Sequence, residues 1–486
     1  MINKTSYLRG RQCPLRPWLD ARPDVAKTPE GDYDEMEIFE PFLREARQVE
    51  DLAESLFTGK TYTREAEVQA GPLQARIDYL EEMANGVFIW EVKASSGVKP
   101  VHLWDLAFQC LVADGAGLNV QGAGVIYLDK NVFRGAEPLP AEQVLIQEDC
   151  WEKVQSLLEV AQAEVDAQLK TLAKKTPPRI TPQGQCKANR NSKLGNRPDT
   201  CPHLAVEGYC GKQLPRNWAG YLPRIGGKLP GILENGGLAE LGDKELSGLS
   251  DIQLRFVEAY RTDGWVVEQS VLRNDLEALD VYPRSFLDFE FVPACGLPPF
   301  EGMRPNQKLP FQWSLGIQRT CGDVLEIHNF VHPDPTTDPR RDLIENLRET
   351  LPSSGPVIVH FRGAESSVFN LYENWFGGEF WEFAESARDR LEDTCAIAQQ
   401  TLAHPNLLGS FSLKKLAPVL VGQGYDDLAI QNGMLAVTEW QKLEGMHGPE
   451  KDTQLKSLTA YCQRDTELML RLVNSYSELA SEITKI

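Results

Sequence analysis

The sequence lacks several features that would mark a protein for a membrane, for export or for ATP-driven work. No uninterrupted apolar run in its 486 residues is long enough to span a bilayer. The N-terminal segment MINKTSYLRGRQCPLRPW has no apolar signal-peptide core. A P-loop ending in Lys-Ser or Lys-Thr is also missing. We therefore expect a cytoplasmic protein with no membrane partner and no ATP-driven translocation.

Positive charge is scarce, since 50 Lys and Arg residues accompany 70 Asp and Glu residues and the formal net charge is −20. This balance argues against non-specific binding of nucleic acid, which depends on neutralising phosphates. Residues 170–198 are the exception, because they hold eight basic residues and no acid. A solvated loop and a nucleic-acid contact explain this basic segment equally well. Its candidate phosphate contacts are Lys187, Arg190, Lys193 and Arg197.

Cysteine pairs of the CxxC type are absent, although the chain has ten cysteines. Six of them stand in apolar or unremarkable surroundings, and we interpret these as small core residues. The other four are Cys13, near the N-terminus, and Cys186, Cys201 and Cys210, in a segment rich in Gly, Pro and Asn. Three thiols so close in sequence indicate a metal site, but their spacing is too wide for a zinc ribbon.

The chain is longer than one hydrophobic core usually allows, so we expect an α/β protein with more than one domain. We place one α/β domain over residues 1–230, a helical linker over 231–283 and a second α/β domain over 284–486. The segments SFLDFEF, FQWSLGIQR and DVLEIHNFV predict three consecutive antiparallel strands. The later apolar segment PVIVHF predicts a parallel strand beside them.

The positions of four acidic residues in the second domain predict that their side chains lie close together after folding. Asp288 and Glu290 are two apart in SFLDFEF, so both face the same side of a strand. Asp465 falls on the apolar stripe of the last helix, four residues after Tyr461. Glu365 begins the helix after PVIVHF. Because converging carboxylates repel one another, the pattern predicts two bound Mg²⁺ ions between them.

The first domain carries a second set of charged residues, in LQARIDYLEEMANGVFIWEVKAS. Two strand-like runs flank the turn signal Asn85-Gly86, with Asp78 on the first run and Glu91 and Lys93 on one face of the second. Asp78 and Glu91 would hold Mg²⁺, while Lys93 would orient water or neutralise charge on a phosphate. The alternative is a surface ion pair between Glu91 and Lys93.

The second domain resembles the DEDD exonucleases of the tyrosine subclass, which have a ribonuclease H-like fold. The resemblance implies hydrolysis at a 3′-terminal phosphodiester, with Tyr461 positioning the water and the four acids holding metal. Glu365 departs from the family, which usually has Asp there. Asp393 matches a frequent Asp-Thr of these enzymes, but we favour a helix N-cap. In SFSLKK, Lys414 or Lys415 is a candidate phosphate contact, but we favour a solvated helix start.

The first domain resembles the PD-(D/E)XK nuclease core of the RecB-like branch, where Gln109 takes the place of a helical Gln. The Cys-Pro of SYLRGRQCPLRPWL resembles the entry of iron–sulfur RecB-like nucleases. This resemblance implies a [4Fe–4S] cluster on Cys13, Cys186, Cys201 and Cys210. Their spacing is wider than usual, which leaves zinc, with His203 as a further ligand, as the alternative. These nucleases often carry a helical His before the Asp; no such His is present here, and Glu50 is a candidate substitute.

Together the two resemblances cover most of the chain. The pairing of the two domains resembles a bacterial family in which they are fused, and the matching motifs are FLDFE, RPNQKLPFQWSLG, SFSLKKLAPVL and YCQRDTELM. They imply a nuclease that uses Mg²⁺ or Mn²⁺ at two sites and acts on single-stranded ends of DNA or RNA. One alternative is an adaptor that binds nucleic-acid ends with one or both sites degenerate. The other alternative is a redox-sensing regulator built on the cluster.

Overall fold

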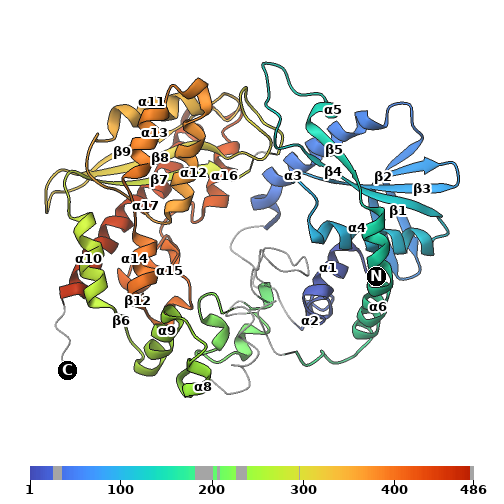
Figure 1. Cartoon of the computed structure of the whole chain (residues 1–486), viewed down its shortest axis with the longest axis horizontal. Helices are drawn as coiled ribbons and strands as arrows, with labels where there is room; N and C mark the ends of the chain where they lie inside the picture. The colour runs from blue at the N-terminus through green and yellow to red at the C-terminus, as the bar shows by residue number, and fades with distance from the viewer. Residues whose placement is uncertain are drawn as a thin grey trace. The chain divides into compact units, whose positions relative to one another are not determined.

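The computed structural model describes residues 1–25, 35–180, 186, 201–204, 208–225, 238–294 and 296–481. The chain divides into two compact units: unit 1 is Met1–Pro215 with Cys295–Gln307, and unit 2 is Arg216–Ala294 with Lys308–Ile486. Each unit has its own five-stranded sheet with helices packed on it, which confirms the α/β class (Figure 1). Within the described ranges, no helix combines the length and the apolar character needed to cross a membrane.

The sheet of unit 1 has the strand order β1-β2-β3-β4-β5. β3 and β4 are parallel, whereas the other neighbouring strands are antiparallel. The strands are β1 (Tyr62–Ala70), β2 (Leu73–Met83), β3 (Gly86–Lys93), β4 (Val120–Leu128) and β5 (Leu145–Asp149). The helices are α1 (Lys4–Gln12), α2 (Leu15–Asp20), α3 (Glu35–Ala53), α4 (Pro100–Gly115), α5 (Ala141–Val144) and α6 (Trp151–Leu172).

The β2–β3 hairpin turns one residue earlier than the sequence indicated. Met83 pairs with Gly86, so the two-residue loop is Ala84-Asn85 and Gly86 begins β3. Glycine is needed at this strand start because a Cβ atom there would lie 2.0 Å from the backbone oxygen of Asn119. The Asn-Gly signal therefore reflects a close approach of the segment before β4 rather than the turn itself.

Alternation along β3 divides its side chains between two cores of unit 1. Ile89 packs in the core that contains Leu106 and Phe108 of α4. Trp90 and Val92 pack in the core on the opposite face of the sheet. Glu91 has the same orientation as Ile89, which turns its carboxylate towards α4 and away from solvent.

The main sheet of unit 2 has the strand order β11-β10-β7-β8-β9. β7, β8 and β9 form the antiparallel meander that the sequence predicted, and β10 and β11 run parallel to β7. The strands are β7 (Arg284–Val292), β8 (Leu309–Gln318), β9 (Glu326–Val331), β10 (Val357–Val359) and β11 (Leu391–Asp393). A second, two-stranded sheet pairs β6 (Val266–Val267) with β12 (Leu402–Ala403).

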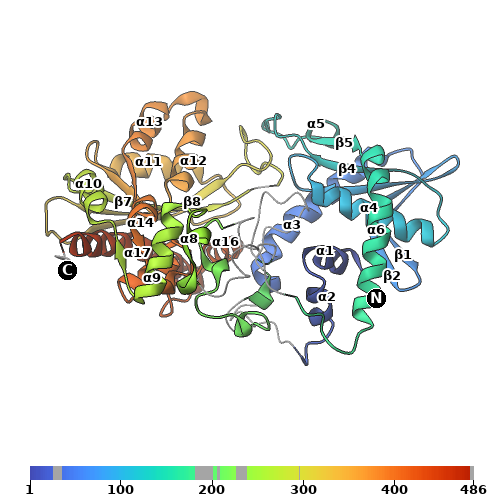
Figure 2. The same ribbon diagram turned by 60° about the horizontal axis from the view of Figure 1, so that its bottom comes forward.

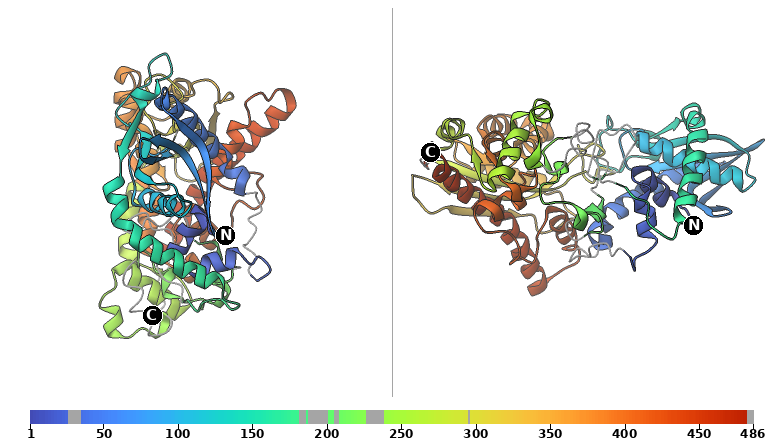
Figure 3. Two further views of the ribbon diagram at one scale, coloured as in Figure 1. Left: turned by 90° about the vertical axis from the view of Figure 1, so that its right-hand side faces the viewer. Right: turned by 90° about the horizontal axis from the view of Figure 1, so that it is seen from below.

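Helices of unit 2 surround this sheet, and α17 packs against β7, β8 and β9. Figure 3 shows the orange-red start of α17 standing out from the rest of unit 2. The helices are α8 (Asp243–Leu246), α9 (Asp251–Thr262), α10 (Gln269–Leu279), α11 (Arg340–Thr350), α12 (Arg362–Tyr372), α13 (Trp381–Asp389), α14 (Thr394–Thr401), α15 (Leu413–Leu420), α16 (Gly433–Gln441) and α17 (Gly448–Ser481).

Residues 231–283, which we expected to be a helical linker, belong to unit 2, and their described part contains α8, α9 and α10 as well as the short strand β6. α10 packs against α14 and α17 (Figure 2), and α9 packs against β12. The buried faces of these helices explain the difference: Phe256 and Leu272 are fully buried. Apolar side chains of this kind need a core, so the segment completes unit 2.

Candidate metal centres

Three carboxylates of unit 2 come together from β7 and α17. One oxygen each of Asp288, Glu290 and Asp465 lies within 4.8 Å of the other two. Asp288 and Glu290 share a face because side chains alternate along β7. No other set of three or more His, Cys, Asp or Glu residues meets this separation in the described part of the chain. The fold therefore brings together three of the four acids that the sequence singled out.

α17 approaches the sheet closely enough to place Asp465 over β7. A Cβ atom on Gly316 of β8 would lie 2.8 Å from Cγ2 of Thr466, so glycine makes this approach feasible. The thiol of Cys462 donates to Asp288, with 3.3 Å between Sγ and Oδ2. The spacing of the three acids thus depends on how α17 packs on β7 and β8.

Burial and mutual repulsion make these carboxylates unfavourable as free anions. Burial, followed by repulsion from Asp465, raises the pKa of Glu290 to about 8. Burial raises the pKa of Asp465 to about 6, and burial with the two neighbouring acids raises the pKa of Asp288 well above its usual value. Lys414 lowers all three pKa values but does not offset the increase. A bound cation would satisfy this group.

Glu365, the fourth predicted acid, lies in the first turn of α12 beside the other three. Its side chain is buried, and its Oε2 has no hydrogen-bond partner within the described residues. Burial and then the charge of Asp288 raise its pKa well above the usual value. Glu365 is outside the 4.8 Å group, so it borders the cluster without joining it.

Two tyrosines and a lysine surround the acid cluster. The hydroxyl of Tyr425 donates to Oδ1 of Asp465, and the ring centroids of Tyr425 and Tyr461 are 5.9 Å apart. The Lys414 ammonium lies 5.4 Å from the Tyr425 ring centroid and 5.2 Å from that of Tyr461. Tyr461 and Lys414 are where the sequence indicated. Tyr425 was missed, because it sits in an irregular segment with no periodic pattern to reveal it.

The hydroxyl of Tyr461 faces the same point as the carboxylate of Glu290. A Cβ atom on Gly433 would lie 3.4 Å from Oε2 of Glu290 and 3.9 Å from the Tyr461 oxygen. Burial and then Glu290 raise the pKa of Tyr461 well above its usual value. The phenol therefore keeps its proton and can act as a hydrogen-bond donor beside the acids.

A cavity of about 470 Å³ opens beside the acid cluster, within the range of roughly 300–1,000 Å³ usual for ligand pockets. Its walls come from β7, the turn after β10, α14, the start of α15 and α17. The lining residues are Asp288, His360, Phe361, Cys395, Gln399, Phe411, Ser412, Leu413, Lys414, Tyr425 and Asp465. Acids, a lysine and aromatic rings thus share one pocket.

Asp393 is the helix N-cap that we favoured. Its carboxylate accepts hydrogen bonds from the backbone N–H groups of Cys395 and Ala396, at 2.8 and 3.2 Å, at the start of α14. Lys415 is exposed in the first turn of α15, whereas its neighbour Lys414 is half-buried towards the acids. Two adjacent positions of one helical turn therefore differ in burial, and only Lys414 remains a functional candidate.

The predicted residues of unit 1 also come together, on β3 and α4. Glu91 is 1% exposed, and its Oε2 accepts a hydrogen bond of 2.6 Å from Nε2 of Gln109. The ammonium of Lys93 pairs with Oε1 of Glu91 and lies 3.2 Å from Asp105 of α4. Although burial alone would raise the pKa of Glu91, its neighbouring lysines lower it below the usual value. The expected Glu91–Lys93 pair exists, but it is buried rather than on the surface.

Asp78 of β2 lies where β2 and β3 separate. The ladder ends at the pair Tyr79 and Trp90, and Oδ2 of Asp78 then accepts a hydrogen bond of 2.7 Å from the Val92 N–H. Burial and then Glu91 raise the pKa of Asp78 to about 8. The carboxylate therefore takes the place of a backbone partner and remains beside Glu91.

Lys4 and Asp105 complete this site and were missed from the sequence. The Lys4 ammonium lies 2.7 Å from Oε1 of Glu91 and 3.5 Å from Oδ2 of Asp105. Asp105 lies one helical turn before Gln109, so both side chains are on the same inward face of α4. Apart from this spacing, the sequence gives no sign that Asp105 belongs to the site. Lys4 gave no signal, since its contact joins distant parts of the sequence.

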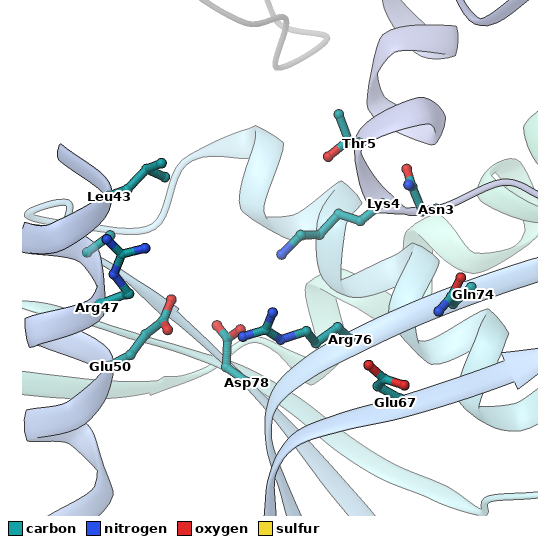
Figure 4. Close-up of a pocket in the computed structure, with 11 residues that line it drawn as sticks. Asn3, Lys4, Thr5, Leu43, Arg47, Glu50, Glu67, Gln74, Arg76 and Asp78 are labelled. Carbon is teal, nitrogen blue, oxygen red and sulfur yellow. The ribbon is translucent and has the colours of Figure 1, made fainter. Parts of the chain in front are cut away.

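Glu50 of α3, the proposed substitute for histidine, lines a cavity of about 580 Å³ together with Lys4 and Asp78. Figure 4 shows the carboxylates of Glu50 and Asp78 pointing towards each other, with the Lys4 ammonium above them. Burial and then Glu91 raise the pKa of Glu50. Lys4 and Asp78 of the candidate site therefore line a cavity whose wall includes residues of α3.

The four predicted cysteines lie near one another in unit 1. Burial and then Cys186, Cys201 and Cys13 raise the pKa of Cys210 to about 12. No three of the four sulfur atoms lie within 4.8 Å of one another in the described residues. A tetrahedral zinc ion would bring sulfurs to about 3.8 Å, because its bonds to sulfur are about 2.3 Å long.

His203 and Arg16 lie beside the cysteines in different roles. Nε2 of His203 is 2.9 Å from Oδ1 of Asp20, which engages this ring nitrogen away from the thiols. Arg16 is buried and partly offsets the effect of burial on the pKa of Cys13 and Cys201. The arginine favours negative charge on these sulfurs.

Four predicted phosphate contacts, Lys187, Arg190, Lys193 and Arg197, lie outside the described residues.

Residues 285–412 match the family described as "Domain of unknown function (DUF2779)". This match covers part of unit 2, including Asp288, Glu290, Glu365 and Asp393, and ends before Tyr461 and Asp465. No curated protein matches the chain.

Proposed function

We propose that unit 2 is a divalent-metal-dependent 3′→5′ exonuclease of the ribonuclease H-like, DEDD type. The observation that carries this proposal is the convergence of Asp288, Glu290 and Asp465 within 4.8 Å, with raised pKa values. The antiparallel meander followed by parallel strands supports the same fold. Carboxylate oxygens are the donors that Mg²⁺ and Mn²⁺ prefer, and the unpartnered Oε2 of Glu365 adds another donor nearby.

The residues around the cluster have complementary roles in this proposal. When bound, the metal supplies Lewis acidity at a phosphoryl oxygen and acidifies water. Asp288, Glu290 and Asp465 hold it, and the protonated Tyr461 hydroxyl orients water beside Glu290. Tyr425 fixes the orientation of Asp465 through its hydrogen bond. Lys414 attracts the phosphate backbone, because its ammonium borders the cavity.

Unit 1 is, in the same proposal, a second metal-dependent nuclease of the RecB-like PD-(D/E)XK type. Asp78 and Glu91 lie on strands that separate at this point, and Gln109 holds the second oxygen of Glu91. Lys93 is placed to neutralise charge on a phosphate. The mixed sheet in which only β3 and β4 are parallel supports this fold.

The cysteines are the proposed ligands of a [4Fe–4S] cluster. The four thiols affect one another's pKa values, but their sulfur atoms are farther apart than a single zinc ion would hold them. This spacing suits a cluster of several metal ions. The buried Arg16 favours the anionic thiolates that such a cluster needs. Anaerobic purification followed by iron, sulfide and zinc analysis distinguishes the cluster from zinc.

Digestion of labelled strands tests the nuclease proposal. The full chain with Mn²⁺ is expected to shorten 5′-labelled single-stranded DNA or RNA from the 3′ end. Asp288→Asn, which keeps the size of the side chain, should slow this reaction roughly 100-fold or more. Glu478→Gln, an exposed change on the same helix as Asp465, is the matched control. If the double variant Asp288→Asn/Asp465→Asn kept full activity, unit 2 would not be the source of the strand shortening.

The second candidate function is an adaptor that binds nucleic-acid ends. It is favoured in unit 1 by the two ammonium groups on Glu91, which neutralise the acid without a metal ion. Lys93→Ala separates the two functions for this unit. Residual cleavage that is present in Asp288→Asn and lost on adding Lys93→Ala assigns a nuclease to unit 1. Strand binding without any cleavage in the presence of Mn²⁺ assigns the adaptor.

A further inference from the structure

Phe361 combines an exposed ring with a strained backbone at the edge of the unit 2 cavity. The residue is 60% exposed, and it belongs to the wall of the same cavity as Asp288 and Asp465. Its φ angle is +89°, in the left-handed region that bulky residues rarely adopt. An exposed ring contributes little to packing, so folding alone does not explain an aromatic residue here.

The carboxylate of Asp393 holds this backbone in place. Its two oxygens accept hydrogen bonds of 2.9 Å from the N–H groups of Phe361 and Arg362. The same side chain caps α14, so the turn after β10 is joined to the turn after β11. Strain that is fixed so firmly by its surroundings is typical of functional sites.

The cavity contains the parts needed to bind a nucleotide. The carboxylates fit a metal ion, and the ammonium of Lys414 suits a phosphate. Phe361, in the wall of the same cavity, offers a flat apolar ring. Bases of every kind stack on aromatic rings, because each has a π-face. We propose that Phe361 stacks on the 3′-terminal base of a single strand and so positions its last phosphodiester at the acid cluster.

This inference rests on the proposed function of unit 2 and specifies its substrate as an unpaired terminal nucleotide. Stacking does not depend on base identity, so little sequence preference is expected. A blunt duplex end already stacks its terminal pair and must first open to present a single base. The full chain should therefore bind single-stranded ends more tightly than blunt ends.

Fluorescence of 2-aminopurine tests the contact in the full chain. Oligonucleotides carry this base at the 3′ end or the 5′ end, with Ca²⁺ replacing Mg²⁺ to occupy the acids while binding is measured. A third oligonucleotide ends in an abasic 3′ residue. The variants are Phe361→Ala, Phe361→Gly and Phe361→Trp. Trp381→Ala, which removes another exposed ring of unit 2, is the control.

Stacking predicts that the 3′-terminal label is quenched by the original protein, Phe361→Trp and Trp381→Ala. Phe361→Ala and Phe361→Gly should lose this quenching and bind the strand about tenfold more weakly. The abasic strand should bind all variants equally. Glycine accepts a positive φ, so Phe361→Gly should melt at the same or a higher temperature, which separates lost binding from lost folding.

Three results overturn the inference in whole or in part. Unchanged quenching and affinity in Phe361→Gly, while the strand still binds, remove the stacking role and leave the proposed nuclease intact. Failure of the original protein to bind any strand in Ca²⁺ or Mn²⁺ removes the proposed function and the inference with it. Quenching of the 5′ label alone supports stacking and overturns the 3′ polarity.

Discussion

Two ammonium groups contact one buried carboxylate at Glu91. Lys4 lies 2.7 Å from Oε1, and Lys93 contacts the same oxygen, while Gln109 occupies Oε2. A buried carboxylate needs partners of this kind when no metal ion is present. Both of its oxygens are therefore engaged, and a metal ion approaching Oε1 must compete with Lys4.

Substitution of Lys4 by methionine should raise the affinity of unit 1 for Mn²⁺. Methionine keeps a similar length and removes the competing charge, so we expect a gain of about tenfold, or roughly 1.4 kcal/mol. Titration of Mn²⁺ followed by electron paramagnetic resonance measures this affinity, with Asp288→Asn and Asp465→Asn present to weaken the site of unit 2. Lys60→Met, which removes a lysine paired with Glu81, is the control. Equal or weaker affinity in Lys4→Met would contradict competition.

Local spacing predicted some of these residues, and long-range packing placed the others. The alternation of a strand was enough to pair Asp288 with Glu290, and Glu91 with Lys93. Lys4 reaches Glu91 because α1 packs beside the sheet, and a contact between residues so far apart in the sequence cannot be predicted from their spacing. Only a periodic element, or a resemblance to a known family, reveals a site residue before the fold is known.

The position of Asp465 depends on the contact between α17 and β8. Gly316 admits the helix because a Cβ atom there would lie 2.8 Å from Cγ2 of Thr466 and 3.0 Å from Cδ1 of Leu325. The Leu325 atom ends a flexible side chain, whereas Thr466 is fully buried on the helix itself. Added volume at this point therefore moves α17 rather than the loop.

Gly316→Ala should lower the free energy of unfolding by about 1–3 kcal/mol and weaken Mn²⁺ binding at the acids of unit 2. Thr466→Ser removes the Cγ2 atom, so the double variant should recover most of both losses. Calorimetry and Mn²⁺ titration of the four proteins form a double-mutant cycle. Gly264→Ala is the control, since its nearest contact would be an ordinary 3.8 Å. Additive effects without recovery would show that Thr466 does not carry the contact.

Helices and strands with strong local patterns could be predicted from the sequence. The compact unit in which each of them packs could not. The three strands of the β7–β8–β9 meander follow from apolar and aromatic runs, and the parallel β10 follows from PVIVHF. Residues 231–283 were predicted to be a helical linker, because an apolar stripe does not identify the element against which it packs. That partner, α17, lies far along the chain from α10.

The charge of the metal-free acid cluster affects the stability of the whole chain. A carboxyl group with a higher pKa in the folded state binds more protons when folded, so the free energy of unfolding falls as pH rises between the two values. For Glu290 this window runs from the ordinary 4.5 to about 8, and for Asp465 from 3.8 to about 6. Lys414 reduces the effect without reversing its sign.

The metal-free chain should accordingly lose stability between about pH 5 and pH 8, by up to about 1.4 kcal/mol per pH unit for each group. Calorimetry follows this loss, and Glu290→Gln should flatten it, because glutamine does not titrate. The transition that changes in Glu290→Gln belongs to unit 2, which identifies it in a chain with two units. Mn²⁺ should restore stability most at the upper end of the range, where the acids are ionised. A slope that is the same in Glu290→Gln and Glu478→Gln would show that the buried cluster does not govern it.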